Sequence, residues 1–184
     1  LIQTAEGAMS EAHNILSRMR ELAVQAASDT INNTDRANLN TEFTSLLAEI
    51  DRIATSTQFN GVNILTGGST AMSLQIGANK DSSGDNIFTL NVTPAGNFYA
   101  SKLEATTTAM SVTAQGVANL AISTLDSAIN AVSTARTSIG SLQSRLESAT
   151  RTLGVAAENA AAANSRIADA DIAQSMSELV RAQI

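Results

Sequence analysis

Residues 115–153 read QGVANLAISTLDSAINAVSTARTSIGSLQSRLESATRTL, and the stretch continues to Ile184 without a proline. Its apolar residues recur with spacings near four and three: Ala118, Ile122, Leu125, Ile129, Val132, Ile139, Leu146, Leu153, Ala157, Ala160 and Ile167. A repeat near 3.5 residues keeps one stripe of a helix against a partner helix. The spacing therefore predicts a long helix over 115–184 that forms the seam of a coiled coil or bundle. At 1.5 Å per residue, its first 53 residues would span roughly 80 Å.

Two shorter helices are predicted before it, over 1–28 and 35–56. Both carry apolar residues with the same spacing. In the first helix these are Ala5, Met9, Ala12, Leu16, Met19, Ala23 and Ala26, and in the second they are Leu39, Phe43, Leu46, Ile50 and Ile53. The polar stretch 28–34 breaks the pattern, and Thr34 or Asp35 is the expected N-cap of the second helix. Helices joined by so short a loop pack antiparallel, with the long helix as third partner.

The segment 57–96 has the pattern of turns and strands. Asn60-Gly61 is a strong turn signal, and Phe59 beside it is expected to anchor the loop to the helices. Apolar and polar residues alternate in 72–76 and again in 87–92, which predicts a β-hairpin. Residues 97–114 are weakly patterned and are expected to form a short connection, either an extended arm or a helix.

These patterns place the chain in the mainly α class. The predicted architecture is an elongated antiparallel bundle or coiled coil of three long helices with a small β-hairpin region. Along the chain it comprises a helical hairpin (1–56), a loop and β-hairpin (57–96), a connection (97–114) and a long helix (115–184). The composition agrees: 43% of residues are hydrophobic but only 3% are aromatic, which suits a thin core between helices.

Charge and residue content exclude several classes of function. The net charge is −6, of which −4 falls in residues 1–60 from eight acidic residues and four arginines, so neither nucleic acid nor a membrane is an expected partner. Cysteine is absent, which excludes disulfides and thiolate chemistry. The single histidine, His13, has no nucleophile motif near it. Asp169 and Asp171 would point to different sides of a helix, and Asp81–Asp85 lacks the ligand spacing of a calcium loop. No enzyme activity, cofactor or metal is predicted.

Three stretches of the sequence together resemble bacterial flagellin. They are Gln3-Thr-Ala-Glu-Gly-Ala-Met continued by Leu16-Ser-Arg-Met-Arg-Glu-Leu-Ala-Val-Gln25, then Glu49-Ile-Asp-Arg52 with Thr57-Gln-Phe-Asn-Gly61, and finally Ser165-Arg-Ile-Ala-Asp-Ala-Asp-Ile-Ala173 continued to Ile184. The resemblance covers both helical ends and the strand at 74–79, and leaves out about 93–117.

This resemblance implies a structural subunit of the flagellar filament, extracellular, polymerising with other copies of itself. The sequence would correspond to the inner rod-like part of the subunit, without the terminal helices that line the filament channel. The implied further partners are the flagellar type III export apparatus and the capping machinery. Residues 97–114 would replace the variable outer domains that flagellins usually carry there. Head-to-tail contacts that do not close are the physical basis of such a filament.

The resemblance also implies that the chain is a ligand of an innate-immune Toll-like receptor. Carried over onto this sequence, the contact residues are Arg18 and Leu22, with Leu16 and Gln25 nearby and Glu42 on the second helix. Spacing alone favours a buried Leu22, whereas the resemblance favours an exposed one that forms a small hot spot beside arginine.

Two other functions are compatible with parts of the sequence. A hook–filament junction protein shares the helical ends of flagellin, but the stretches Thr57–Gly61 and Ser165–Ala173 favour flagellin. A coiled-coil stalk or adhesin would need an anchor or a head domain, and the sequence contains neither.

Overall fold

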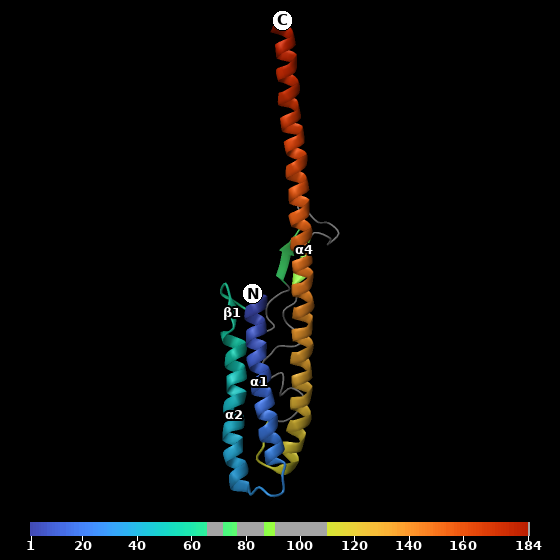
Figure 1. Ribbon diagram of the computed structural model, residues 1–184. Coiled ribbons are helices and arrows are strands. Elements are labelled where there is room, and N and C mark those ends of the chain that lie inside the picture. Colours follow the sequence, from blue (N-terminus) through green and yellow to red (C-terminus); the bar gives the residue numbers. More distant parts are fainter. Residues whose placement is uncertain (66–71, 77–86, 91–109, 184) are drawn as a thin grey trace. The chain divides into compact units, whose positions relative to one another are not determined.

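The computed structural model describes residues 1–65, 72–76, 87–90 and 110–183, with side chains undescribed at 72–74, 88–90 and 169–174. The chain divides into two units, Leu1–Leu142 and Gln143–Ile184. Helices dominate the described residues (Figure 1), so the mainly α prediction is confirmed.

The first unit is built on an antiparallel helical hairpin. Helix α1 (Ile2–Ala26) and helix α2 (Asn33–Ser56) are joined by residues 27–32 and lie side by side (Figure 1). Every predicted seam residue of α1 is buried. The buried positions of α2 are Arg36, Phe43, Ile50 and Ala54, while the predicted seam residues Leu39, Leu46 and Ile53 are half-buried. Both helices were therefore predicted correctly, but α2 presents a face slightly rotated from the predicted one.

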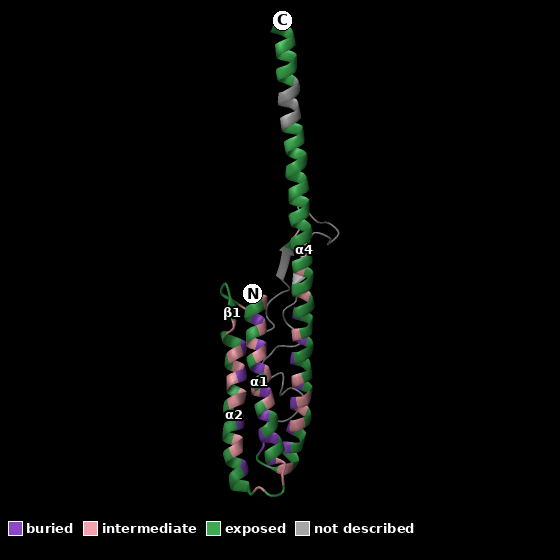
Figure 2. Ribbon diagram, viewed as in Figure 1, coloured by how far each residue is buried: buried purple, intermediate pink, exposed green. Residues whose placement is uncertain are grey.

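Helix α4 (Gln115–Gln183) contributes its first part to the same core. Its buried residues are Ala118, Ala121, Leu125, Ala128, Val132, Ala135 and Ile139, a regular 3-4 repeat. The predicted seam residues Ile122 and Ile129 are only half-buried, and the alanines one position earlier, Ala121 and Ala128, are buried in their place. Leu146 is half-buried, and Leu153, Ala157, Ala160 and Ile167 are exposed, so the predicted seam is wrong beyond about Leu142 (Figure 2).

The N-cap of α2 differs from the predicted one. Helix α2 begins two residues earlier than expected, and its N-cap is Asn32, whose Oδ1 accepts a hydrogen bond of 2.8 Å from the backbone N–H of Asp35. This bond satisfies one of the N–H groups that lack a partner in the first turn of a helix. Thr34 and Asp35 lie inside the helix instead.

A two-residue hairpin follows α2. Strands β1 (Gln58–Phe59) and β2 (Val62–Asn63) pair antiparallel around Asn60 and Gly61, whose φ angles are +53° and +76°. Positive φ at both central residues is the requirement of a type I′ turn, which Asn-Gly meets at little cost. The turn was predicted correctly.

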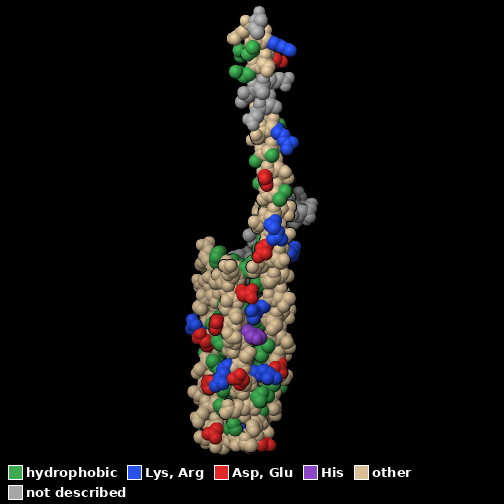
Figure 3. Space-filling model, in the orientation of Figure 1, with side chains coloured by type: hydrophobic (Ala, Val, Ile, Leu, Met, Phe, Trp, Pro, Cys, Tyr) green, Lys and Arg blue, Asp and Glu red, His purple; other side chains and the backbone are tan. Residues whose placement is uncertain are grey.

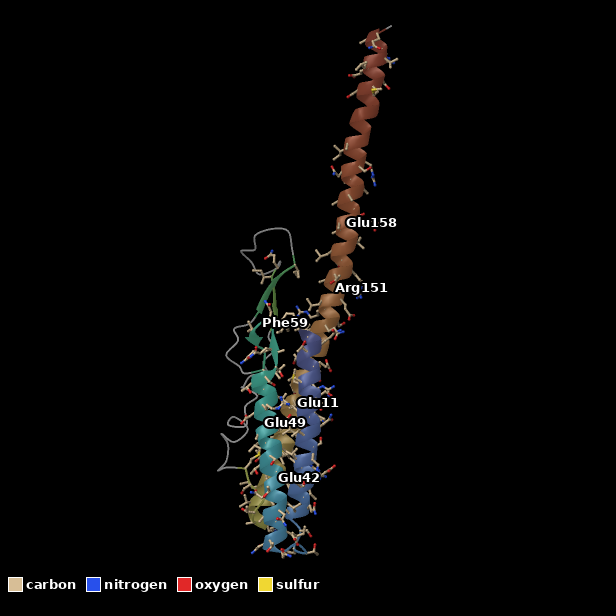
Figure 4. The ribbon with its side chains drawn as sticks, turned by 90° about the vertical axis from the view of Figure 1, so that its left-hand side faces the viewer. Glu11, Glu42, Glu49, Phe59, Arg151 and Glu158 are labelled. Carbon is tan, nitrogen blue, oxygen red and sulfur yellow. The ribbon has the colours of Figure 1, made fainter. Side chains whose placement is uncertain are left out.

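The expected role of Phe59 was wrong. Phe59 is 43% exposed and does not anchor the loop. Figure 4 labels it at the β1–β2 hairpin. Ile64 and Leu65, which follow the hairpin, are the buried residues that do so. The pairing of β1 with β2 fixes the face of the ribbon on which the Phe59 side chain lies, and β1 is exposed at both of its residues.

The predicted second hairpin is confirmed for its strands. Strand β3 (Met72–Gln75) pairs antiparallel with β4 (Ile87–Leu90), with Met72 opposite Leu90 and Gln75 opposite Ile87. The segment Asp81–Asp85 between these strands lies outside the described residues, as do residues 97–109 of the predicted connection. Residues 110–114 are described and precede α4: Met110 and Val112 are buried, and the N–H of Val112 donates to Oδ1 of Asn40 at 2.9 Å.

The second unit is the remainder of α4. Residues 150–168 and 175–183 are exposed throughout (Figure 2).

Along α4, in both units, many side-chain hydroxyls donate to the backbone carbonyl four residues earlier, which satisfies each proton within the helix itself. They belong to Thr124, Ser127, Ser133, Thr134, Thr137, Ser138, Thr150 and Thr152.

A candidate interaction surface on helix α1

Arg18 is the centre of an exposed charged cluster between α1 and α2. Its Nε donates to Oε1 of Glu42 at 2.9 Å, and its Nη1 donates to Oε2 of Glu21 at 3.0 Å. The hydrogen bond to Glu42, with a smaller contribution from Glu21, raises the pKa of Arg18 further above its usual value. The side chains of Arg18 and Glu42 are 51% and 44% exposed. The cluster therefore presents an ordered guanidinium to solvent.

A second arginine joins α1 to α4. Nε of Arg20 donates to Oδ1 of Asp126 at 2.6 Å, and further along the helices Nη2 of Arg136 lies 3.3 Å from Oε1 of Glu6. Arg18 and Arg20 thus reach in opposite directions to the two helices that flank α1. Figure 3 shows acidic and basic side chains interspersed on this face of the bundle. Exposed ion pairs of this kind add only about 0–1 kcal/mol each to stability, so their main effect is to fix side-chain positions.

Only part of the predicted receptor site lies on this surface. Arg18 and Glu42 are in contact, and Gln25 is exposed two turns further along α1. Leu16 and Leu22 are each 1% exposed and belong to the core, so the predicted exposure of Leu22 is wrong. The reason is that α1 packs against two helices, so that residues flanking its central stripe are covered as well.

A further ion pair lies within α2 and, like the others, was not singled out from the sequence. Nε of Arg52 donates to Oε2 of Glu49 at 2.7 Å on α2, and this bond lowers the pKa of Glu49 and raises that of Arg52. Glu49 lies two turns from Glu42 along α2 (Figure 4). The i, i+3 spacing of Glu49 and Arg52 was the available signal, since side chains so spaced on a helix are neighbours.

Acidic and histidine side chains do not form a metal site in the described part of the chain. Within 1–65, 72–76, 87–90 and 110–183, no three His, Cys, Asp or Glu side chains gather closely enough to hold a metal ion. His13 is half-buried on α1, and its buried Nδ1 has no hydrogen-bond partner in that part of the chain. The side chains of Asp169 and Asp171 lie outside the described residues. No described helix combines the length and apolarity needed to cross a membrane.

Comparison with known proteins gives consistent similarities along the chain. Residues 1–70 match the family model of the bacterial flagellin N-terminal helical region, and residues 122–184 match that of the C-terminal helical region. Over its whole length, the chain is 42% identical to a flagellin of Halalkalibacterium halodurans, of which it spans 65%. It is also 34% identical to a flagellin of Bacillus subtilis, of which it spans 69%.

A solved structure shows the same likeness. The crystal structure of Bacillus cereus flagellin superimposes with a TM-score of 0.63 at 33% identity, and the match covers 79% of this chain and 80% of the other. Sequence and fold thus point to the same group of proteins.

Proposed function

The chain belongs to the bacterial flagellin family, and we propose that it is a structural subunit of an extracellular flagellar filament. The observation that carries the proposal is the match of both helical regions to the flagellin models in chain order. Two relatives from Treponema maltophilum, 36% and 37% identical, bear the name flagellar filament core protein. We propose other copies of this chain as its principal partners, and the flagellar export and capping machinery as partners before and during assembly.

The helical geometry suits this role. Many hydroxyls of α4 have protons already bonded within the helix. The eleven charged residues of α4 are of both signs, six acidic and five basic. Such a surface can pack against a copy of itself without leaving charged groups buried and unpaired. We further propose that residues 97–114 take the place of variable outer domains, which leaves the helical unit as the main body of the subunit.

Immunogold electron microscopy on the source cells tests the filament proposal. An antibody raised against residues 1–184 is expected to label filaments along their whole length. Label confined to the filament base would instead identify a hook–filament junction protein. Label on the cell envelope, with bare filaments, would support the coiled-coil stalk or adhesin and contradict the proposal.

We also propose that the exposed cluster on α1 is recognised by an innate-immune Toll-like receptor. Arg18, Glu42 and Gln25 would make the contacts, and the buried Leu16 and Leu22 would support α1 from beneath. What favours this surface is the double restraint on Arg18, because Glu21 and Glu42 hold its guanidinium in place before any partner arrives. A pre-ordered arginine loses less side-chain freedom on binding than a mobile one and is a common hot-spot residue.

Arg18→Ala is expected to weaken receptor activation about 30-fold, which corresponds to the loss of a hot-spot contact of about 2 kcal/mol. Activation is measured as the concentration of chain that gives half-maximal signalling in receptor-expressing cells. Arg52→Ala is the matched control, since Arg52 is also an exposed arginine in an ion pair but lies on α2 beside Glu49. Equal potency of Arg18→Ala and the unchanged chain, at equal helix content, would remove the receptor proposal.

A further inference from the structure

The first buried position of α2 is occupied by a charged residue. Arg36, Phe43 and Ile50 are spaced seven apart and form the buried face of α2 together with Ala54. Arg36 is 8% exposed and is the one buried charged side chain among the described residues. A position that the heptad pattern reserves for an apolar residue therefore holds a guanidinium.

The Arg36 guanidinium donates hydrogen bonds to backbone carbonyls at the C-terminal end of α1. Its Nε donates to the carbonyl oxygen of Ala26, the last residue of α1, at 2.9 Å, and its Nη2 donates to the carbonyl oxygen of Ser28, also at 2.9 Å. Its Nη1 donates to Oδ1 of Asn33 at 3.1 Å. The last carbonyls of a helix lack partners within the helix and carry its negative dipole end. Arg36 thus caps α1 from a residue of α2.

This arrangement exists at only one alignment of the two helices. If α2 moved along α1 by one heptad in one direction, the guanidinium would reach the level now held by Phe43, which is fully buried. Helix carbonyls in the middle of α1 are bonded within their own helix, so the charge would be buried there without acceptors. Movement in the other direction would separate Arg36 from Ala26 and Ser28. An apolar side chain at position 36 would carry neither penalty.

We propose that Arg36 is the residue that determines the register of α2 against α1. A single polar residue in an otherwise apolar helical seam is known to select register, at some cost in stability. By setting this register, Arg36 also places Glu42 of α2 beside Arg18 of α1. Arg36 therefore determines the geometry of the charged cluster although it is hydrogen-bonded to neither Arg18 nor Glu42 itself.

Distance measurement between spin labels tests the proposal. The chain has no cysteine, so labels can be attached at Gln25→Cys on α1 and Ala48→Cys on α2, both exposed positions. The unchanged background is expected to give one narrow distance. Arg36→Met, which keeps the side-chain length and removes the charge, is expected to add a second population displaced by roughly 10 Å, the rise of one heptad. Arg52→Met removes an exposed arginine from the same helix and is expected to leave the single distance unchanged.

A single unchanged distance in folded Arg36→Met would overturn the proposal, because the connection 27–32 would then set the register alone. Should Arg36→Met lose its helical circular dichroism, the same labels are placed in Arg36→Lys. An ammonium lacks the fork that bonds Ala26 and Ser28 together. A broadened or double distance in Arg36→Lys supports the assignment, and a single narrow one at the original value refutes it.

Discussion

Replacing Phe43 by alanine is expected to lower the free energy of unfolding by about 3–5 kcal/mol. Phe43 is fully buried on α2 and is the one buried aromatic residue among the described side chains. The core around it consists largely of alanine and aliphatic residues, which are too small to fill the space of a phenyl ring. Since domains of this kind are stable by about 5–15 kcal/mol, the loss would be a large part of the total.

Urea unfolding followed by circular dichroism measures this effect through the shift of the midpoint. Phe59→Ala provides the control, because Phe59 has the same side chain but is 43% exposed, and we expect it to cost less than about 1 kcal/mol. Equal losses from the two variants would mean that Phe43 does not occupy the centre of the helical core.

The second large effect is expected on α4, where Leu125→Ala should cost about 2–5 kcal/mol in the isolated chain. Leu125 is fully buried in the first unit, whereas Leu153 on the same helix is 45% exposed. Leu153→Ala is therefore expected to change the unfolding free energy by less than about 0.5 kcal/mol.

This pair of variants measures where the packed seam of α4 ends. Both leucines fit the same apolar repeat in the sequence, and the chemical change is identical. Thermal unfolding of the two variants in parallel gives the comparison. A comparable loss from Leu153→Ala would show that the seam continues past Leu142 in solution and would contradict the structure.

The helices and strands were predictable because each depends on a pattern within a short stretch. Spacing alone located α1, α2 and α4, and alternation located β3 and β4. The Asn60-Gly61 turn could be predicted because few residue pairs accept positive φ at both positions. The buried face of α1 was also predicted correctly, since its seam residues recur at regular spacings of four and three.

Features that depend on a third element were not predictable. Leu22 is buried, as its spacing favoured, and the expectation of an exposed Leu22 came from the family resemblance rather than from the repeat. On α4 the repeat favoured Ile122 and Ile129, but Ala121 and Ala128 are the residues buried in the core. The buried position of Arg36 was not predicted either. Its acceptors include backbone carbonyls at the end of α1, and a pattern of side-chain types carries no information about such acceptors.

The exposed part of α4 has a consequence for the conformational entropy of assembly. Between Val155 and Asn164 the sequence is dominated by alanine, which loses no side-chain freedom on entering a helix and has the highest helix propensity. Ordering the backbone of a coil costs about 1–2 kcal/mol per residue. Since this stretch is helical in the single chain, the entropy cost of ordering its backbone does not reduce the free energy gained when subunits associate. A filament could then grow through individually weak contacts, because each arriving subunit has little left to order.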